Sequence, residues 1–401
     1  MSAILDLAQH FDALNNVLLA AEDYWRPSPF IEPHLPWAAT HPELAARCLA
    51  LTDEKVQHLE SDIGALHDWL SAALPTISEL RRLIALPSAA IKPVHFPLRW
   101  DLAVPGRKAA QIRAFAQCIQ PSGQGFLDWC AGKSHLGRTL SYMHQQPCIA
   151  LERDALLCEQ GRRLDTQKRV SFIATDVLNS AVKLPENAHV LALHACGDLH
   201  RHLIREAILH GVSALSLAPC CYALWLDDYY RPLSARAQRQ GLRLTRDDLK
   251  LAVQESVTAS TASLTQSRQL AVWRLAFDQL QRDMRGCDQY LSTPSMPLSS
   301  VRLGFREFCC QLARKKGLVL GRSVDWCRYE AQGERRWAEV RRLQLVRHAY
   351  RRALELWLVF DAALFLEESG YRVTVAEFCE RKLTPRNILI HAERVSANAE
   401  F

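Results

Sequence analysis

The stretch "LDWCAGKSHLG", residues 127–137, decides between two folds. Its Gly-Lys-Ser is typical of a phosphate-binding loop, which requires the spacing G-x-x-x-x-G-K-[ST]. That spacing puts the first glycine at position 127, where the chain has Leu127, and Gly125 lies two residues too early. The spacing therefore excludes a nucleoside-triphosphate loop.

The same stretch also fits a strand, a sharp turn and the start of a helix. The run "GQGFLDW" (123–129) is apolar and carries Asp128 near its end. Small residues in the turn, Ala131, Gly132 and Gly137, allow backbone N–H groups to come close to a ligand. Lys133 either contacts that ligand or lies in solvent at the helix start.

Four more apolar runs follow, with helical stretches between them. They are "QQPCIALE" (145–152), "RVSFIATD" (169–176), "HVLALHA" (189–195) and "VSALSLAP" (212–219). This alternation predicts a doubly wound parallel sheet. Near the end of the chain, "GYRVTVAEFCE" and "ILIHAER" around "RKLTPRN" predict a β-hairpin. Together they predict an α/β, Rossmann-like sheet of seven strands with an antiparallel edge strand.

The pattern along the chain predicts four segments. Residues 1–95 are expected to form a helical N-terminal domain, with Thr52 before a helix start. Residues 96–239 hold strands one to five, residues 240–344 form a helical, basic insertion between strands five and six, and residues 345–401 supply the last helix and the closing hairpin.

Acidic residues stand at the ends of three successive strands, and a ligand of an open α/β sheet lies beyond these ends. Asp128 is suited to hold a cationic amino group. Glu152 is suited to accept both hydroxyls of a ribose, and Asp176 to accept from an adenine amino group. One such acid is a weak signal, but three in succession indicate a nucleoside-containing cofactor.

The motifs "FLDWCAGKSHLGRTL", "LHACGDL", "LAPCCYAL" and "LTPRNILIHAER" resemble those of class I S-adenosylmethionine-dependent methyltransferases. More narrowly, they resemble the family grouped around methyltransferase-like protein twenty-five, which is related to the tRNA acceptor-stem 2′-O-methyltransferases. The resemblance implies S-adenosyl-L-methionine as cofactor, bound at Asp128, Cys130, Ala131, Gly132, Lys133, Gly137, Glu152, Asp176 and His194. The chain departs from the pattern at Cys130, where the family more often has glycine, and it lacks the zinc-binding arrangement of the tRNA enzymes.

Cysteines follow the fourth and fifth strands. Cys196 follows strand four, and Cys220 and Cys221 follow strand five. "APCCY" is not the N-P-P-Y motif of amino-group methyltransferases, because that motif follows strand four. RNA cytosine-C5 methyltransferases place a cysteine after each of these strands and use one as a nucleophile. The alternative is that these thiols are small buried residues that pack the sheet.

Polar residues beside these cysteines complete the expected catalytic set. His194 and Asp198 are candidates to orient a substrate or to act as a base, and His194 also fits a hydrogen-bonded core histidine. Tyr222 is a candidate to stack on a flat substrate or to pack.

Residues 311–352 are rich in basic residues and have aromatic residues among them. This pattern suits phosphate contacts and base stacking, although charge runs are usually solvated helix faces. Arg107 and Lys108 add to it near the first strand. The basic residues of the run are Arg314, Lys315, Lys316, Arg322, Arg328, Arg335, Arg336, Arg341, Arg342, Arg347, Arg351 and Arg352.

Composition limits the remaining possibilities. The chain has 401 residues, a net charge of +6 and 13 cysteines, none of them in a C-x-x-C pair, so we expect free thiols in a cytoplasmic protein without a zinc finger or other metal site. The N-terminus lacks the basic region of a signal peptide, and the longest apolar stretch, "LELWLVFDAALFL", is interrupted by Asp361, so we expect no membrane span. The oligomeric state stays open.

The sequence therefore predicts an S-adenosylmethionine-dependent methyltransferase acting on RNA, either tRNA or rRNA. Two alternatives stay open. One is a protein methyltransferase acting on a ribosomal or translation protein. The other is a non-catalytic module that keeps the fold in order to bind RNA or a protein.

Overall fold

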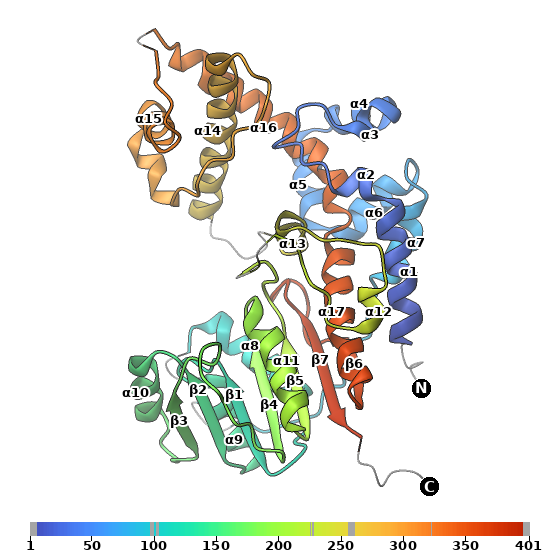
Figure 1. Ribbon diagram of the computed structural model, residues 1–401, viewed down its shortest axis with the longest axis vertical. Coiled ribbons are helices and arrows are strands. Elements are labelled where there is room, and N and C mark those ends of the chain that lie inside the picture. Colours follow the sequence, from blue (N-terminus) through green and yellow to red (C-terminus); the bar gives the residue numbers. More distant parts are fainter. Residues whose placement is uncertain are drawn as a thin grey trace. The chain divides into compact units, whose positions relative to one another are not determined.

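The computed structural model describes residues 6–96, 100–101, 104–224, 226, 228–255, 261–321 and 323–395. The chain divides into two compact units (Figure 1). The sheet unit contains residues 1–20, 82–255 and 351–401, and the helical unit contains residues 21–81 and 256–350. Arg322, one of the basic residues noted in the sequence, lies outside the described residues.

The sheet unit is built on seven strands in the order β3-β2-β1-β4-β5-β7-β6. Strands β1 to β5 are parallel, and β7 runs antiparallel to both β5 and β6. The predicted antiparallel strand is therefore β7, one place in from the edge. The strands are β1 (Gly125–Trp129), β2 (Cys148–Glu152), β3 (Val170–Ala174), β4 (Ala188–Leu193), β5 (Ala214–Ala218), β6 (Tyr371–Glu377) and β7 (Ile388–Arg394).

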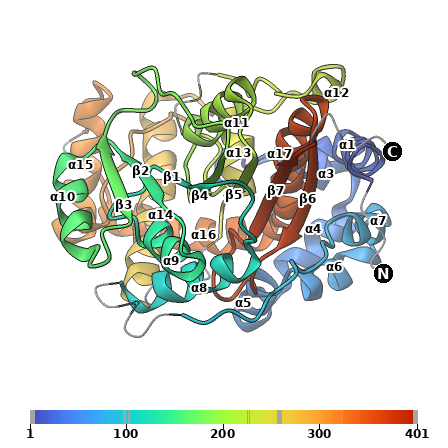
Figure 2. The same ribbon diagram turned by 90° about the horizontal axis from the view of Figure 1, so that it is seen from below.

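Helices cover both faces of this sheet (Figure 2). On one face lie α8 (Gly106–Cys118) and α9 (His135–His144), and on the other lie α11 (Asp198–His210) and α17 (Arg351–Glu368). Helix α10 (Ala155–Leu164) packs beside β2 and β3. Strands β4 and β5 are almost continuously apolar and buried, as expected for parallel strands that are covered on both faces.

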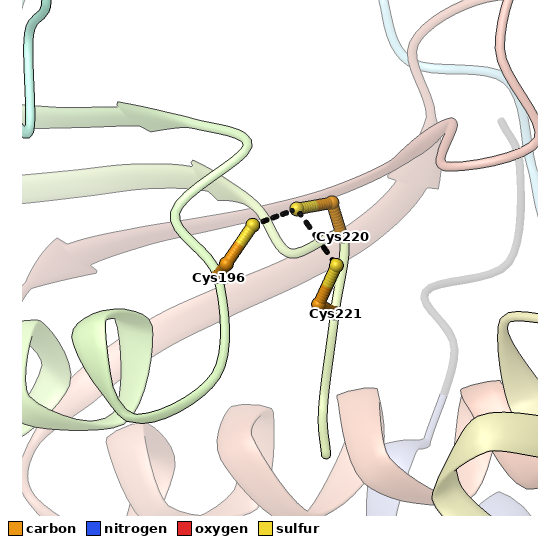
Figure 3. A group of neighbouring side chains, drawn as sticks. All are labelled: Cys196, Cys220 and Cys221. Carbon is orange, nitrogen blue, oxygen red and sulfur yellow. Dashed lines mark hydrogen bonds between the residues drawn. The ribbon is translucent and has the colours of Figure 1, made fainter. Parts of the chain in front are cut away.

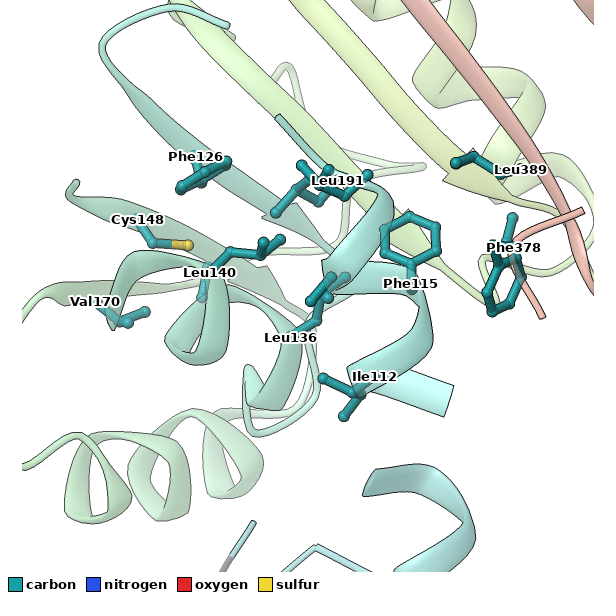
Figure 4. Close-up of a cluster of buried hydrophobic side chains, with 14 of the residues drawn as sticks. Ile112, Phe115, Phe126, Leu136, Leu140, Cys148, Val170, Leu191, Phe378 and Leu389 are labelled. Atoms are coloured by element: carbon teal, nitrogen blue, oxygen red, sulfur yellow. The ribbon is translucent and has the colours of Figure 1, made fainter. Parts of the chain in front are cut away.

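The apolar core beneath α8 and α9 fixes these helices on the sheet (Figure 4). Phe115 of α8 and Leu140 of α9 are fully buried, and Phe126 and Leu191 meet them from the sheet. Because α9 begins within the 127–137 stretch, at His135, this packing also fixes the turn between β1 and α9.

A buried polar row crosses three neighbouring strands. Ser216 of β5 lies 2.9 Å from Nε2 of His189 on β4 and 2.8 Å from Nδ1 of His391 on β7. Ser216 and His391 are direct partners in the antiparallel register. Because buried polar groups are costly unless they are paired, this row favours one register between the parallel strands and the hairpin.

Helix α1 (Leu7–Ala20) belongs to the sheet unit, which differs from the expected N-terminal domain of residues 1–95. Phe11 packs against Trp357 of α17 at 5.3 Å between ring centroids, and the indole N–H of Trp357 donates to buried Asn15 at 3.0 Å. Asp12 pairs with Arg236 of α12 (Ala235–Gln238) at 2.5 Å. These contacts attach α1 to α17, and the short helix α13 (Arg246–Ala252) packs on α17 as well.

The helical unit joins two segments that the sequence pattern places in different domains. Its elements are α2 (Glu22–Trp25), α3 (Pro36–Thr40), α4 (Pro42–Leu49), α5 (Asp53–Ser61), α6 (Ile63–Ser71), α14 (Thr261–Arg285), η1 (Leu298–Leu303), α15 (Phe305–Lys315) and α16 (Trp326–His348). Helix α7 (Thr76–Leu83) crosses the boundary. Thr52 caps α5 as predicted, since its side chain accepts from the N–H of Lys55. The expected boundary at residue 344 falls inside α16, and the last helix before the hairpin is α17 (Arg351–Glu368).

Several arginines of α16 hold these two segments together. Arg341 donates to Glu60 at 2.9 and 2.5 Å, and Arg342 donates to the Asp53 carboxylate at 2.8 Å. Arg347 is buried and donates to the Trp25 carbonyl at 2.7 Å. Part of the basic run is therefore used inside the helical unit, which its sequence pattern did not indicate.

No helix among the described residues combines the length and the apolar character that crossing a membrane requires.

Candidate functional site

The turn after β1 has a strained backbone. Cys130, Gly132 and Ser134 have φ values of 55°, 59° and 49°, in the left-handed region. A residue with a Cβ atom pays about 1–2 kcal/mol in this region. Position 130, where a glycine was expected, therefore does have a glycine-like conformation, and a cysteine adopts it there.

The buried carboxylate of Asp128 stabilises this turn by accepting hydrogen bonds from it. It is 3% exposed, and its Oδ2 accepts from the Ser134 hydroxyl at 2.8 Å and from the Gly137 N–H at 3.0 Å. Burial raises the pKa of this carboxyl to about 6, although the two hydrogen bonds oppose that shift. Asp128 thus ties the end of β1 to the first turn of α9.

Position 137 requires glycine, because neighbouring side chains approach its backbone too closely for a Cβ atom. A Cβ atom at this position would lie 2.4 Å from Oγ of Ser134, 2.7 Å from Sγ of Cys148 and 2.9 Å from Oδ2 of Asp128. Gly132 is the opposite case, because a Cβ atom there would meet no atom within 4 Å. The backbone at Gly132 therefore faces open space at the carboxyl end of the sheet.

The carboxylate of Glu152, at the end of β2, is hydrogen-bonded to the same turn. Its Oε2 accepts from the Gly132 N–H at 2.8 Å, and its Oε1 accepts from the Asp154 N–H at 2.9 Å. The Ala131 N–H donates to the Leu151 carbonyl at 2.9 Å, which continues the β1–β2 pairing into the loop. The structure thus brings Asp128 and Glu152 to the two sides of one turn.

Asp176 lies just after β3, at the same edge of the sheet as the first two acids. Its carboxylate accepts from the side chain of Asn179 at 3.0 Å and from the Leu178 N–H at 3.2 Å. The Asn179 hydrogen bond, followed by that of Leu178, lowers the pKa of this carboxyl. Lys133 is partly exposed in the turn.

The loops after β4 and β5 are hydrogen-bonded to each other. Leu193 pairs with Ala218 at the ends of the strands, and the next bonds run from the His194 N–H to the Ala218 carbonyl at 3.1 Å and from the Gly197 N–H to the Cys221 carbonyl at 2.8 Å. The parallel pairing of the strands therefore extends into the loops and brings Cys196 next to Cys220.

His194 is held in one orientation. Its φ is 66°, and its Nε2 lies 3.0 Å from Oε1 of Gln111 on α8. Burial, with a smaller effect of the Lys108 charge, lowers the pKa of the imidazole, which favours the neutral ring. Because an amide oxygen only accepts, Nε2 carries the proton and Nδ1 carries the lone pair.

The three cysteines form one cluster (Figure 3). The Sγ atoms of Cys196 and Cys220 lie 2.8 Å apart, and those of Cys220 and Cys221 lie 3.7 Å apart. Hydrogen bonds from the Cys196 and Cys220 thiols, aided by the charge of Arg386, lower the pKa of Cys221. The hydrogen bond with Cys196 is the largest cause that raises the pKa of Cys220.

Asp198 and Tyr222 lie beside the cluster in different settings. Asp198 is the first residue of α11 and lies 3.8 Å from a guanidinium nitrogen of Arg201. Tyr222 is 3% exposed and packs edge-on against His200 at 5.7 Å between ring centroids. This placement favours the packing alternative for Tyr222, because a buried ring is not free to stack on a substrate.

Three residues of the site were not anticipated from the sequence. Ser134 donates to Asp128, Gln111 orients His194, and Arg386 acts on Cys221 from the turn between β6 and β7. Ser134 had a signal, since it stands at the expected helix start. Arg386 lies in the quoted motif "LTPRNILIHAER", although nothing in that motif indicated a contact with the cysteines. Gln111 had no signal, because only the folded chain brings it to the site.

Residues 107–226 match the sequence model of a family described as a methyltransferase domain. The match covers less than a third of the 401-residue chain. No curated protein sequence matches the chain.

Several solved structures match parts of this chain. A tRNA (uracil-54, C5)-methyltransferase from Pyrococcus abyssi is 17% identical with a TM-score of 0.23, over 28% of this chain and 28% of that chain. TYW2 from P. horikoshii is 17% identical with a TM-score of 0.24, over 28% and 43%. The N-methyltransferase NodS from Bradyrhizobium japonicum is 14% identical with a TM-score of 0.23, over 35% and 70%. The aligned part spans less than two thirds of the first two of these chains.

The family match and the strand order agree on residues 107–226. This part of the chain is a methyltransferase domain on a Rossmann-like sheet of the class I type. The strained turn, the acids at the strand ends and the cysteine cluster all lie within the matched range.

We predict that Gly137→Ala disrupts the turn while Gly132→Ala does not. An added methyl at position 137 displaces the buried hydrogen bonds of Asp128, so the free energy of unfolding should fall by about 2–3 kcal/mol. At position 132 the methyl meets open space, and only the left-handed backbone costs about 1 kcal/mol. Urea denaturation of the two variants measures this, and equal losses would contradict the assignment.

We predict that Asp128→Asn changes how stability depends on pH. The folded pKa of about 6 exceeds the ordinary value of 3.8 for an unfolded chain, so this carboxyl stabilises the fold fully below about pH 4 and loses that contribution as pH rises to 6. Asparagine does not titrate, and its carbonyl oxygen still accepts both hydrogen bonds. The free energy of unfolding of the variant should therefore gain about 2–3 kcal/mol relative to wild type between pH 4 and pH 6.

Denaturation series at four pH values measure that difference. Asp247→Asn, at an exposed carboxyl of α13 in the same unit, is the matched control and should show no such trend. A difference between Asp128→Asn and wild type that stays constant over this pH range would disprove the buried, titrating carboxyl.

Proposed function

We propose that this chain is an S-adenosylmethionine-dependent methyltransferase that modifies RNA, either tRNA or rRNA. One observation carries the enzyme assignment. A strained turn in the matched domain is fixed by carboxylates from β1 and β2, and it presents Gly132 to open space at the carboxyl edge of a parallel sheet. The quoted motifs support placing the chain with the family grouped around methyltransferase-like protein twenty-five.

The residues around the turn fit such a cofactor. Glu152 uses each carboxylate oxygen once within the protein, so lone pairs remain for the two ribose hydroxyls. Asp176, at the end of the next strand, would accept from the adenine amino group. Asp128 is buried and engaged in the turn, so we assign it to holding the loop rather than to binding the amino group of the cofactor.

When bound, the cofactor supplies an electrophilic methyl group on a sulfonium sulfur. This chain supplies the positioning, which lowers the barrier by holding donor and acceptor in line. The acceptor side is the ends of β4 and β5. Nδ1 of neutral His194 is suited to take a proton from an acceptor that must lose one.

Exposed cations in the helical unit support an RNA substrate. Among the described residues of the 311–352 run, five basic residues are exposed: Arg314, Lys315, Lys316, Arg328 and Arg335. The Arg328 guanidinium lies 5.7 Å from the Tyr329 ring centroid, a contact of the kind that also serves bases. Arg107 and Lys108 are exposed at the start of α8 in the sheet unit. Such cations bind phosphates in a salt-dependent way.

We predict that Glu152→Gln weakens binding of S-adenosylhomocysteine about tenfold to a hundredfold, because a neutral amide replaces the charged acceptor of two ribose hydroxyls. Isothermal titration calorimetry measures the affinity. Glu159→Gln, at an exposed carboxyl of α10, is the matched control and should bind like wild type. No binding of the cofactor by wild type would reject the enzyme and leave a non-catalytic module.

We predict that reversing three exposed charges, Lys315→Glu, Lys316→Glu and Arg335→Glu together, weakens RNA binding at least about tenfold and reduces the slope of log affinity against log salt. Lys55→Glu, at an exposed position of α5 in the same unit, controls for a charge reversal outside the basic run. Binding to bulk tRNA and rRNA at several salt concentrations measures both effects.

The substrate itself is read from labelled methyl transfer. Wild-type protein and a radiolabelled cofactor are added to separate RNA and protein fractions of a strain that lacks the gene. Label in the RNA supports the proposal. Label in a ribosomal or translation protein, with none in RNA, would replace it with a protein methyltransferase.

A further inference from the structure

Three sulfur atoms converge at the ends of β4 and β5, and the proposed function does not use them. The Sγ atoms of Cys196, Cys220 and Cys221 all lie within 4.8 Å of one another. The Cys196–Cys220 separation of 2.8 Å is shorter than the about 3.5–4.0 Å at which even the smaller carbon atoms rest without a bond. All three cysteines are free thiols, so no disulfide explains this approach.

The spacing of the sulfurs suits a metal ion. Three thiolates on a tetrahedral zinc ion, each at about 2.3 Å, stand about 3.8 Å from one another. The Cys220–Cys221 separation is already 3.7 Å. The Cys196–Cys220 pair, at 2.8 Å, has to open by about 1 Å to reach the separation that a tetrahedral ion imposes.

The backbone, rather than a chance rotamer, creates the cluster. The bonds from His194 to Ala218 and from Gly197 to Cys221 fix the two loops on each side of Cys196 and Cys220 (Figure 3). The Cys196 and Cys220 thiols also lie 3.5 Å from the same carbonyl oxygen, that of His194. The sheet thus holds two ligands on one loop and one on its neighbour, as a preformed metal site requires.

We propose that Cys196, Cys220 and Cys221 bind one zinc ion. Among the described residues no histidine or carboxylate completes the set within 4.8 Å, and the three cysteines are each only partly buried. Three protein ligands and one open position is the arrangement of catalytic zinc sites, in which the fourth ligand is water or a substrate atom. The ion therefore lies at the acceptor side of the methyltransferase domain, and its binding releases the thiol protons.

A zinc site at these cysteines is incompatible with their use as nucleophiles. A nucleophilic cysteine attacks carbon 6 of cytosine as a free thiolate, whereas a thiolate bound to zinc has donated that electron pair to the metal. The cluster hence serves one chemistry or the other, and the number of zinc ions per chain separates them.

The test uses the full-length protein with zinc chloride as the probe. Purified under reducing conditions and then dialysed, the wild type should retain about one zinc per chain by plasma mass spectrometry. X-ray absorption should show three sulfurs at about 2.3 Å. Replacement by cobalt(II) should give sulfur-to-cobalt charge-transfer bands, which depend on thiolate ligands and not on enzymatic activity.

Variants assign the ligands. Cys196→Ser, Cys220→Ser and Cys221→Ser should each weaken zinc affinity at least about a hundredfold, beyond the effect of losing a residue that only orients a ligand. Cys327→Ser, at an exposed thiol of the helical unit, and Cys118→Ser, on α8, should bind zinc like wild type. Circular dichroism checks that each variant folds. Where a variant does not fold, a mercurial titration of the wild type tests for thiolate ligands instead, and it should release one zinc per chain.

Two results would overturn the proposal. One is a wild-type protein without stoichiometric zinc after reconstitution, and the other is zinc binding that survives replacement of all three cysteines. A covalent adduct between Cys220 or Cys221 and RNA containing 5-fluorocytosine would assign the cluster to nucleophilic catalysis instead. Because none of the zinc measurements needs methyl transfer, their outcome is independent of the cofactor and RNA experiments.

Discussion

The buried carboxylate of Asp128 is the constraint on which the candidate site depends. It accepts from Ser134 and Gly137 at the same oxygen, so it connects the end of β1 to the first turn of α9. Without these bonds the backbone of Cys130 and Ser134 has little reason to stay in the left-handed region, which costs free energy. The turn is therefore kept in place by buried hydrogen bonds, whereas its open side stays free at Gly132.

The second constraint is the register of the parallel strands. The pairing of β4 with β5 continues beyond the strands, and it places Cys196 beside Cys220 although 24 residues separate them in the chain. The register of β1 with β2 does the same for Asp128 and Glu152. One sheet edge thus carries a carboxylate-held turn on one side and a thiol cluster on the other. In the function proposed above, the turn would hold the methyl donor and the cluster would lie on the acceptor side.

Much of this arrangement could be predicted from sequence, and the reason is local. Each strand is a short apolar run with a polar residue at its end, so all five parallel strands and the hairpin are found where the pattern predicts them. The turn at 130–137 was recognisable from its small residues after an apolar run, whereas the spacing only excluded a phosphate loop. Contacts between distant segments carry no such signal. The attachment of α1 to α17 through Trp357 and Asn15, the orientation of His194 by Gln111 and the burial of Tyr222 depend on packing that no short window of sequence contains.

The basic residues show most clearly which contacts the sequence alone does not reveal. Residues 311–352 look like one basic surface in the sequence, yet Arg341, Arg342 and Arg347 join the two segments of the helical unit. Arg352 is buried in the sheet unit between Glu355 and Glu377. An arginine has five N–H donors and a charge that hardly changes with pH, so it can satisfy buried carboxylates and carbonyls as readily as it binds phosphate. The net charge of a segment therefore does not tell how large its basic surface is or where it lies. That depends on which guanidinium groups are already paired with carboxylates or carbonyls inside the protein. Arg386 is a further example, because its buried guanidinium donates to Glu355 and its charge acts on the Cys221 thiol.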